Sequence, residues 1–433
     1  HPKKWTLENI ANMTRQQKAL GLSYDWDREV TTCKADYYKW TQWFFELFYK
    51  RGLAVKKKSA VNWCSHCATV LANEQVIDGK CWRCDNVVEK KDLSQWFFKI
   101  TDYADELLQD LDKLGGWPER VRIMQNNWIG RSEGLELTFE IPELNDKVTV
   151  YTTRPDTSFG ITFLVLAAEH PLVEKICENN PRAEEIRAFC KRVRNQSDVE
   201  RTSAESEKEG IFTGCHVINP FNGRKAELWI TNYVLYDYGT GAVMGVPSGD
   251  QRDWMFAKKY NLDIIPVVSP KDRVLTLEEM TCAYEDKDGQ VINSGKFSGM
   301  EMHAAMEAIS QEAIEKGFGK KRVNFRLRDW LISRQRYWGA PIPVIYCPNC
   351  GEVLVPEEQL PVLLPEDVSF EAGNKSPLST SHDFVHCKCP KCGADATRET
   401  DTMDTFICSS WYFLRYTDAH NDKAAFTTTA SPG

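Results

Sequence analysis

Long apolar runs are absent from this sequence of 433 residues, and none approaches the roughly twenty apolar residues that a membrane-spanning helix needs. A signal-peptide pattern, an internal repeat and a long low-complexity tract are absent as well. The hydrophobic fraction of 42% and the charged fraction of 27% are ordinary for a globular protein. The sequence therefore predicts several folded domains without a membrane segment, and we expect a cytoplasmic location.

An excess of basic residues is also lacking, because the net charge is −8. This balance disfavours a basic coat protein for nucleic acid, although local patches such as Lys56-Lys57-Lys58 leave RNA binding open. The sequence begins with His1 in place of an initiating Met, so we expect a piece of a longer product.

The fifteen cysteines are an odd number in a chain without secretory features, which favours thiols or metal ligands over disulfides. The spacing Cys64-x2-Cys67-x13-Cys81-x2-Cys84 predicts a structural zinc ribbon, since four thiolates complete a tetrahedral shell. A second set of four cysteines, listed below, predicts a second zinc module, with Cys387 as an alternative ligand. His66, His382 and His386 are not expected to bind the metal. Alternatively, these knuckles no longer bind metal and pack as small buried residues. The second set is Cys347, Cys350, Cys389 and Cys392.

Hydrophobic periodicity indicates a mixture of helices and strands. Aromatic residues at helical spacing predict a helix over 37–50, and alternation at Leu135, Leu137, Phe139 and Ile141 predicts a strand. Further helices are predicted over 100–114, 184–193 and 302–316, and further strands over 147–152, 162–167, 226–234 and 264–268.

Residues 326–339 form a helix-length run that is rich in arginine and tryptophan. Such a run can hold an RNA backbone by charge and stack bases on aromatic rings, so it predicts an RNA contact. The competing interpretation is a structural helix that joins two domains. The candidate RNA-binding residues are Arg326, Arg328, Arg334, Arg336 and Trp338.

Two motifs about ninety residues apart carry the chemistry of a hydrolytic site. The first, Tyr151-Thr-Thr-Arg-Pro-Asp-Thr157, places hydroxyls around a Pro-Asp turn, where they can orient a water and a ribose hydroxyl. The second, Tyr238-Gly-Thr-Gly-Ala-Val-Met-Gly-Val-Pro-Ser-Gly-Asp250-Gln-Arg-Asp253, offers a carboxylate for a substrate ammonium. A strand end followed by an Asx-type turn is the bland alternative for the first motif.

These motifs resemble the editing site of class I aminoacyl-tRNA synthetases, and among them the bacterial leucyl-tRNA synthetases. Three further segments carry the same resemblance: 9–29, Asn127-Trp-Ile-Gly-Arg-Ser132, and Glu399-Thr-Asp-Thr-Met-Asp-Thr-Phe-Ile-Cys-Ser-Ser-Trp-Tyr-Phe-Leu-Arg415. The resemblance implies a leucine–tRNA ligase, which charges tRNA-Leu with leucine by use of ATP and Mg²⁺ and hydrolyses mischarged products. It also implies an α/β fold, in which a partial Rossmann-type catalytic core carries zinc-ribbon modules and a mixed α/β editing domain.

The resemblance assigns roles to individual residues. Asp250 would hold the α-ammonium of the mischarged amino acid, and Thr152 and Thr153 would position the water and the terminal adenosine. The methyl group of Thr157 would exclude leucine while admitting smaller or straighter side chains. Gly249 stands where the family usually has a histidine, which removes a possible hydrogen-bond donor. Phe406, Ser409 and Tyr412 would line the leucine pocket of the synthetic site.

We expect seven segments. They are catalytic core (1–60), zinc ribbon (61–95), helical connection (96–127), editing domain (128–325), return to the core (326–346), second zinc module and linker (347–396), and a further core segment (397–433).

The His-x-Gly-His and Lys-Met-Ser-Lys-Ser signatures of the family are missing from the sequence. We therefore expect a middle fragment that edits but does not activate leucine, so that ATP and Mg²⁺ serve only the full-length parent. The expected partners are tRNA-Leu, leucine and near-cognate amino acids, and we expect a monomer. Two alternatives are a stand-alone trans-editing hydrolase and a non-catalytic module that binds zinc and RNA.

Overall fold

The computed structural model describes residues 1–71, 75–77, 79–194, 196, 201, 206–236, 239–370 and 376–427. The chain divides into two compact units, one formed by residues 1–100 and 329–433 and the other by residues 101–328. The first Tyr of the second sequence motif, Tyr238, and part of the segment 71–76 lie outside the described residues. In the part of the chain that is described, no helix is long and apolar enough to cross a membrane.

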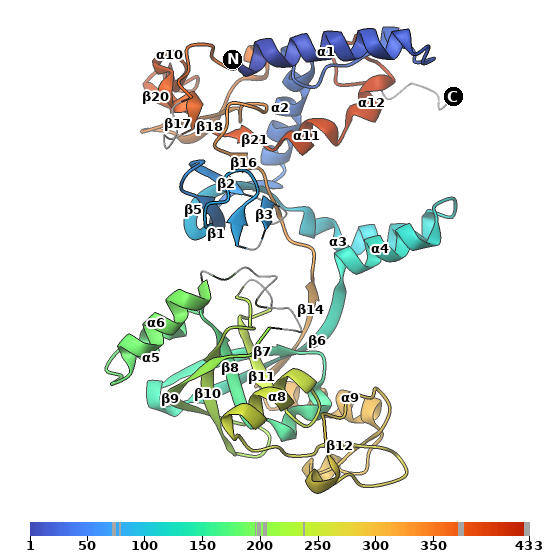
Figure 1. Ribbon diagram of the computed structural model, residues 1–433, viewed down its shortest axis with the longest axis vertical. Coiled ribbons are helices and arrows are strands. Elements are labelled where there is room, and N and C mark those ends of the chain that lie inside the picture. The colour runs from blue at the N-terminus through green and yellow to red at the C-terminus, as the bar shows by residue number, and fades with distance from the viewer. Residues whose placement is uncertain are drawn as a thin grey trace. The chain divides into compact units, whose positions relative to one another are not determined.

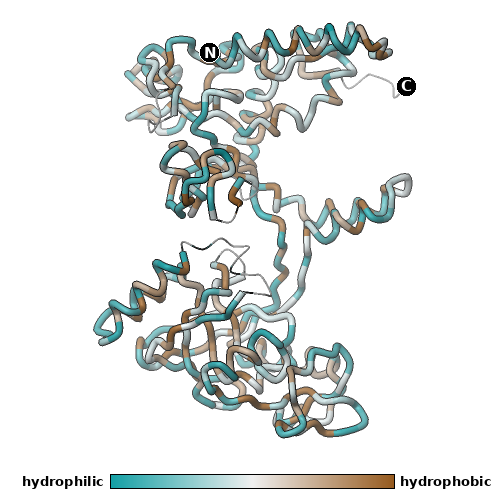
Figure 2. The backbone as a smooth tube through the Cα atoms, viewed as in Figure 1, coloured by the Kyte–Doolittle hydropathy of each residue, from teal (hydrophilic) through white to brown (hydrophobic). Residues whose placement is uncertain are grey.

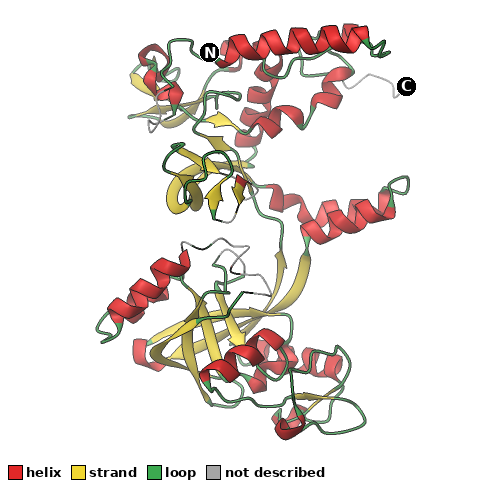
Figure 3. Cartoon of the chain, viewed as in Figure 1, coloured by secondary structure: helices red, strands yellow, loops and turns green. Residues whose placement is uncertain are grey.

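The unit of residues 101–328 is built around a seven-stranded sheet (Figure 3). The strand order is β11-β8-β10-β9-β6-β14, and β7 also pairs with β6. The strands are β6 (Arg131–Ile141), β7 (Asp146–Thr152), β8 (Phe163–Ala167), β9 (Gly210–Ile218), β10 (Lys225–Thr231), β11 (Ala242–Gly245) and β14 (Gly319–Phe325), with a separate pair β12 (Val268–Ser269) and β13 (Gln290–Val291). The helices are α3 (Ala104–Asp110), α4 (Glu119–Ile129), α5 (Leu172–Cys177), α6 (Ala183–Arg194), α8 (Gln251–Tyr260) and α9 (Met302–Glu315).

Strand β8 lies inside this sheet and is buried on both faces, as its unbroken apolar sequence requires. Leu164 and Leu166 belong to the core that α5 and α6 cover, whereas Phe163 packs with Phe256 of α8 in another cluster. The helices therefore cover opposite faces (Figure 1), and the central strands are among the hydrophobic segments of Figure 2. This core fixes the ends of β7 and β11, which carry the two motifs.

The other unit contains small antiparallel sheets and helices. The sheet orders are β15-β5-β1-β2, β18-β17-β20-β19, β16-β21 and β3-β4. The strands are β1 (Ala54–Cys64), β2 (Thr69–Leu71), β3 (Val76–Ile77), β4 (Lys80–Cys81), β5 (Glu89–Phe98), β15 (Trp330–Leu331), β16 (Ser333–Arg334), β17 (Val344–Cys347), β18 (Gly351–Leu354), β19 (His386–Lys388), β20 (Asp395–Arg398) and β21 (Thr402–Met403). The helices are α1 (Pro2–Ala19), α2 (Ala35–Lys50), α10 (His382–Val385), α11 (Thr405–Ser409) and α12 (Tyr412–Tyr416).

Helix α2 supplies the core of this unit through its aromatic stripe. Phe45 is fully buried and meets the ring of Trp96 edge-on, and Tyr37 stacks on Trp411. The helix predicted over 37–50 is thus confirmed, and core packing is the role of its aromatic residues.

Four predicted elements differ from the structure. The run 326–339 contains the short strands β15 and β16 and no helix, because Trp330 and Leu331 pair with the edge of β5. The strand predicted over 226–234 ends at Thr231. Beyond it the Asn232 side chain, in place of strand pairing, bonds to the backbone of Glu207 and Glu209. The strand predicted over 264–268 is reduced to β12, since Pro266 cannot donate to a ladder. The helix predicted over 100–114 is α-helical only in α3.

Candidate editing and zinc sites

The threonine motif forms the end of β7 and the start of a six-residue 3-10 helix over Pro155–Gly160. The Thr152 hydroxyl oxygen accepts the N–H of Arg154 at 2.9 Å, so its own proton stays available for another acceptor. The Thr157 hydroxyl donates to the carbonyl of Arg154 at 2.8 Å. Because that bond engages the hydroxyl, the methyl group is the part of the Thr157 side chain that can contact other groups. Thr152 and Thr157 are buried, and Thr153 is exposed.

The approach of β7 to β6 depends on Gly134. A Cβ atom at Gly134 would lie 2.3 Å from the carbonyl oxygen of Thr152 and 2.8 Å from the Tyr151 ring. Any side chain there would push the end of β7, and with it Thr152, away from the sheet. The glycine thus sets the position of the motif.

Arg154 and Asp156 stabilise the turn from within. The Arg154 guanidinium binds the Asp156 carboxylate through Nε at 3.0 Å and Nη2 at 2.8 Å, and Asp156 is completely buried. This bidentate pair occupies the carboxylate. Asp156 is therefore a structural residue of the motif and is not available to a substrate ammonium.

The second motif brings Asp250 to the start of α8, in the loop that follows β11. The Asp250 carboxylate caps the helix by accepting the N–H of Asp253 at 3.0 Å, yet 37% of its side chain remains exposed. A Cβ atom at the neighbouring Gly249 would lie 3.3 Å from the Thr157 methyl carbon. The fold thus brings the two motifs into contact although they are far apart in the sequence.

Asp253, which the sequence analysis did not assign to the site, lies beneath the same loop. Its carboxylate accepts the N–H of Val246 at 3.0 Å and lies 3.4 Å from Nε of Arg252. Burial, followed by the charge of Asp250, raises the pKa of Asp253 to about 7 against the opposing effect of Arg252. The sequence signal that points to Asp253 is the Asp-x-x-Asp spacing, which places a second carboxyl three residues after the helix cap.

The cysteines form the two groups that the spacing predicts. In each group the four sulfur atoms lie within 4.8 Å of one another, and neither group contains Cys387 or, among the described residues, a histidine. Sγ–Sγ separations are 3.4 Å for Cys64 and Cys84 and 3.5 Å for Cys347 and Cys392. Zn–S bonds of about 2.3 Å imply sulfur separations of about 3.8 Å in a tetrahedron, so the residues fit zinc. We name them the first cysteine cluster (Cys64, Cys67, Cys81, Cys84) and the second cysteine cluster (Cys347, Cys350, Cys389, Cys392).

We expect metal analysis of the purified chain to find two zinc ions per molecule, one in each cluster. Cys67→Ser should lower the count to one and destabilise the hairpin of β1 and β2, because the metal joins the two knuckles. Cys350→Ser should lower it to one through the other cluster. A metal-replete preparation without zinc would show that these thiols serve only as packing.

The arginines of 326–339 have different environments. Arg326 and Arg328 lie at the surface. Arg334 is buried, forms an ion pair with Asp404, and donates to the carbonyl of Leu331 at 3.0 Å. An RNA backbone cannot reach the Arg334 guanidinium in this arrangement, so the prediction of an RNA contact does not hold for this residue.

Trp338 and Arg336 complete the segment. The Trp338 ring is half-buried and lines a cavity of about 310 Å³ together with Thr405 and Cys408. Arg336 is half-buried, and its backbone carbonyl accepts the Thr402 hydroxyl at 3.0 Å.

The residues predicted for the leucine pocket lie on and just after α11. Asp404 caps this helix by accepting the N–H of Phe406 at 2.9 Å, and the buried Arg334 holds the same carboxylate. Ile407 and Cys408 face the core, whereas Phe406 is 71% exposed, and Ser409 and Tyr412 are exposed as well. The helix therefore presents the three predicted residues outward.

Two family models match the chain and together cover nearly all of it. Residues 126–314 match the model described as leucyl-tRNA synthetase, editing domain, and residues 1–133 and 300–430 match tRNA synthetases class I (I, L, M and V). The chain belongs to the class I tRNA synthetases. Both candidate editing motifs lie within the editing-domain match, and both cysteine clusters lie within the class I match.

Similar proteins agree with this assignment. The leucine–tRNA ligase of Symbiobacterium thermophilum is 59% identical over 426 residues, which is 97% of this chain and 49% of that protein. The leucine–tRNA ligase of Nitratidesulfovibrio vulgaris is 55% identical over 99% of this chain and 52% of that protein. A LeuRS from Agrobacterium radiobacter, solved as a ternary complex with tRNA and LeuAMS, matches with a TM-score of 0.81, 41% identity, and coverage of 100% of this chain and 50% of that chain.

The resemblance to leucyl-tRNA synthetases and the fold class are thus confirmed, with mixed α/β sheets in a class I core segment and an editing domain. The chain spans about half the length of the curated relatives that it matches.

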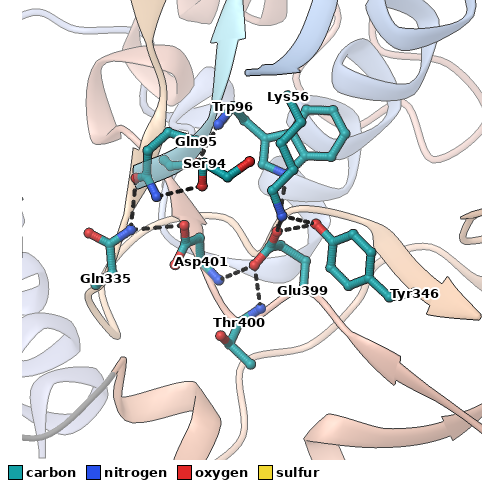
Figure 4. Close-up of polar contacts among 10 residues, drawn as sticks. Lys56, Ser94, Gln95, Trp96, Gln335, Tyr346, Glu399, Thr400 and Asp401 are labelled. Atoms are coloured by element: carbon teal, nitrogen blue, oxygen red, sulfur yellow. Dashed lines mark hydrogen bonds and ion pairs between the residues drawn. The ribbon is translucent and has the colours of Figure 1, made fainter. Parts of the chain in front are cut away.

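In the core segment of this class I synthetase, a buried polar network joins the elements that precede and follow the editing domain (Figure 4). The Glu399 carboxylate accepts the Trp96 indole N–H at 3.0 Å and lies 3.1 Å from the Lys56 ammonium. The Tyr346 hydroxyl donates to the same oxygen. Burial acts to raise the pKa of Glu399, but the Lys56 charge and these donors outweigh it and lower the pKa.

Asp401 belongs to the same network and has the opposite shift. Gln335 donates to its carboxylate at 2.8 Å and also to Gln95 at 3.0 Å. Burial, followed by the charge of Glu399, raises the pKa of Asp401 to about 7. Asp401 is therefore the member of this carboxylate pair that is protonated first as the pH falls.

Asp401→Asn should remove a pH dependence of stability. Because the folded pKa lies above the unfolded value of about 3.9, the contribution of Asp401 is present below about pH 4 and is lost as the pH rises to about 7. Asparagine keeps an acceptor for Gln335 without the charge. We expect the unfolding free energy of the unmodified chain to fall relative to that of the variant between about pH 4 and about pH 7, measured by denaturant titration. A constant difference across that range would contradict the raised pKa.

Proposed function

We propose that this chain is the part of a leucine–tRNA ligase that hydrolyses mischarged tRNA-Leu. The parent enzyme would join leucine to tRNA-Leu with ATP and Mg²⁺, act as a monomer and reside in the cytoplasm. The observation that carries the editing proposal is the close approach of Gly249 to the Thr157 methyl group, which a Cβ atom at Gly249 would meet at 3.3 Å, and which places the Asp250 loop against the threonine motif. Both lie in the region that matches the editing domain.

Asp250 is the residue best suited to hold the α-ammonium of the substrate. Of the carboxylates in the two motifs, Asp156 is bound by Arg154, and Asp253 is buried with a raised pKa. Asp250 lies 3.7 Å from Nε of Arg252 but is partly exposed, at the edge of the threonine motif. An ionised carboxylate at this place attracts a substrate ammonium and fixes the aminoacyl group for attack.

The reaction adds water across the ester bond between the amino acid and the ribose of the terminal adenosine. The water oxygen becomes part of the amino-acid carboxylate, and the ribose oxygen leaves with a proton. Thr152 keeps a hydroxyl proton for the water or the adenosine, since its oxygen already accepts from Arg154. Thr153 is exposed beside it and can contact the same groups.

Thr157 acts as the gate in this proposal, because its hydroxyl is tied back to Arg154 and its methyl group is left to meet the substrate side chain. One methylene in such a pocket discriminates by about 1 to 3 kcal/mol. The synthetic site has the same limit for leucine against its near neighbours. When a second pocket with a steric gate acts after the synthetic site, the overall discrimination is the product of the discriminations of the two sites.

The remaining site assignments follow the same proposal. Phe406, Ser409 and Tyr412 would contact leucine in the synthetic site of the parent enzyme, and their exposure on and after α11 leaves them free to do so. Arg326, Arg328, Arg336 and Trp338 would contact tRNA. A stand-alone trans-editing hydrolase is not favoured, because residues 1–133 and 300–430 match the class I synthetase model.

Deacylation by the purified chain tests the proposal. The norvaline side chain is unbranched and has one carbon fewer than that of leucine, so tRNA-Leu charged with norvaline should lose its amino acid faster with the chain than without it. A chain that binds this tRNA and leaves the ester intact would support the alternative of a non-catalytic module that binds zinc and RNA.

A further inference from the structure

Helix α4 carries large apolar side chains on a face that nothing in its unit covers. Trp128 is 64% exposed, and Ile123 and Met124 are exposed as well. Among the residues that the structure describes, none of the three belongs to a hydrophobic cluster, whereas Ile129 on the other side of the helix is buried. An exposed apolar patch of this kind marks an interaction site. We name it the open face of α4, and helical spacing assigns to it Arg120, Ile123, Met124, Asn127 and Trp128.

Two arginines flank the apolar residues of the open face. Arg120 lies near the start of α4, about 12 Å along the helix axis from Trp128. Arg326 lies at the other end, where its Nη1 is 3.5 Å from the carbonyl oxygen of Asn127 and its stem packs against Gly130. Both guanidinium groups are exposed, and neither forms an ion pair with a described residue.

These charges favour an anionic occupant over the apolar surface of another protein. Helix α4 contains one acidic residue, Glu119 at its first position, against two arginines. Proteins bind unpaired RNA with the same combination, because arginines attract the phosphates while a base stacks on an exposed indole ring. In a double helix the faces of the bases are covered by their neighbours. The open face therefore fits single-stranded RNA.

The open face also adjoins the strand that leads to the threonine motif. Strand β6 begins at Arg131, two residues after the end of α4, and its Leu135 pairs with Thr152. Those four residues of strand span about 14 Å, so one short single-stranded segment can reach both places. We propose that the open face of α4, together with Arg326, binds the unpaired 3′ end of tRNA-Leu, with a base stacked on Trp128. This inference rests on the proposed editing function and adds a contact for the end that carries the amino acid.

Binding of tRNA-Leu to the zinc-loaded full chain tests this surface. The two probes are intact tRNA-Leu and tRNA-Leu trimmed of its unpaired 3′ nucleotides. Trp128→Ala should weaken the binding of intact tRNA roughly 5- to 150-fold, the effect of losing one stacked base, and leave the binding of trimmed tRNA unchanged. Trp128→Phe keeps an aromatic ring and should lie between. Arg120→Ala should lower the slope of log affinity against log salt by about 0.7 for the intact tRNA.

Trp5→Ala is the matched control, because Trp5 is 70% exposed on α1 in the other unit. It should bind both probes as the unmodified chain does. Equal binding of intact tRNA by Trp128→Ala and the unmodified chain would overturn the proposal. Equal weakening for both probes, or no binding by the unmodified chain, would overturn it as well. Unchanged tRNA binding with a dimer that Trp128→Ala dissociates would overturn it in favour of a second copy of the chain.

The same variants separate this surface from the editing function. Trp128-dependent binding without deacylation of norvalyl-tRNA-Leu would support the surface and contradict the editing function. Deacylation that Trp128→Ala leaves unchanged at a limiting concentration of the chain would support editing and overturn the surface.

Discussion

Asp250→Ala should abolish the deacylation of mischarged tRNA by this chain. Removal of one partner from a buried, hydrogen-bonded charge pair costs about 2 to 5 kcal/mol, which corresponds to a loss of roughly 30-fold to several thousand-fold. In the free chain Asp250 lies 3.7 Å from Nε of Arg252, yet 37% of its side chain is exposed, so a substrate ammonium can reach the same carboxylate. The measurement is the rate of norvaline release from tRNA-Leu at a fixed concentration of the chain.

The structure adds a second consequence to this substitution. Asp250 is the N-cap of α8, so alanine should also destabilise the editing unit by about 0.5 to 2 kcal/mol. Asp250→Asn is the matched control, since asparagine caps a helix about as well as aspartate and lacks the charge. It should lose deacylation while its thermal midpoint stays close to that of the unmodified chain. Full activity in Asp250→Asn would mean that another group holds the ammonium.

Thr157→Ser should make the chain hydrolyse correctly charged leucyl-tRNA-Leu. Serine keeps the hydroxyl bond to the Arg154 carbonyl and removes only the methyl group, so it isolates the gate from the tether. The expected gain in leucyl-tRNA hydrolysis is about 10- to 200-fold, the effect of one methylene in a pocket. Thr157→Ala should give a gain of the same direction with an added loss of stability. Continued exclusion of leucine by Thr157→Ser would place the gate elsewhere.

The two cysteine clusters were predictable from residue type and spacing. Two tight knuckles of two cysteines each predict a group that could hold zinc, because each short loop places two sulfurs together. Strong periodicity over a long segment was equally informative, as α2, β6, α6 and α9 lie where it predicts them. These patterns are local, so no knowledge of the remaining fold was needed.

Features that depend on tertiary contacts were not predictable from the sequence. The burial of Arg334 follows from Asp404, which lies seventy residues away, and the pairing of β15 with β5 replaces the helix expected over 326–339. The meeting of Gly249 with Thr157 results from the position of β11 next to β8 in the sheet. The capping role of Asp250 and the buried carboxyl of Asp253 became visible only with the loop that both residues hold.

The comparison of norvalyl-tRNA-Leu with leucyl-tRNA-Leu, both incubated with the zinc-loaded chain in the absence of ATP, tests the central claim most directly. Gly249→His and Gly249→Ala belong in the same experiment, because any side chain at 249 meets the Thr157 methyl group and only histidine adds an imidazole. The editing account predicts that the unmodified chain accelerates the release of norvaline. Leucine should be released only at the spontaneous rate. Spontaneous rates for both esters, in the unmodified chain and in Gly249→His alike, would contradict it.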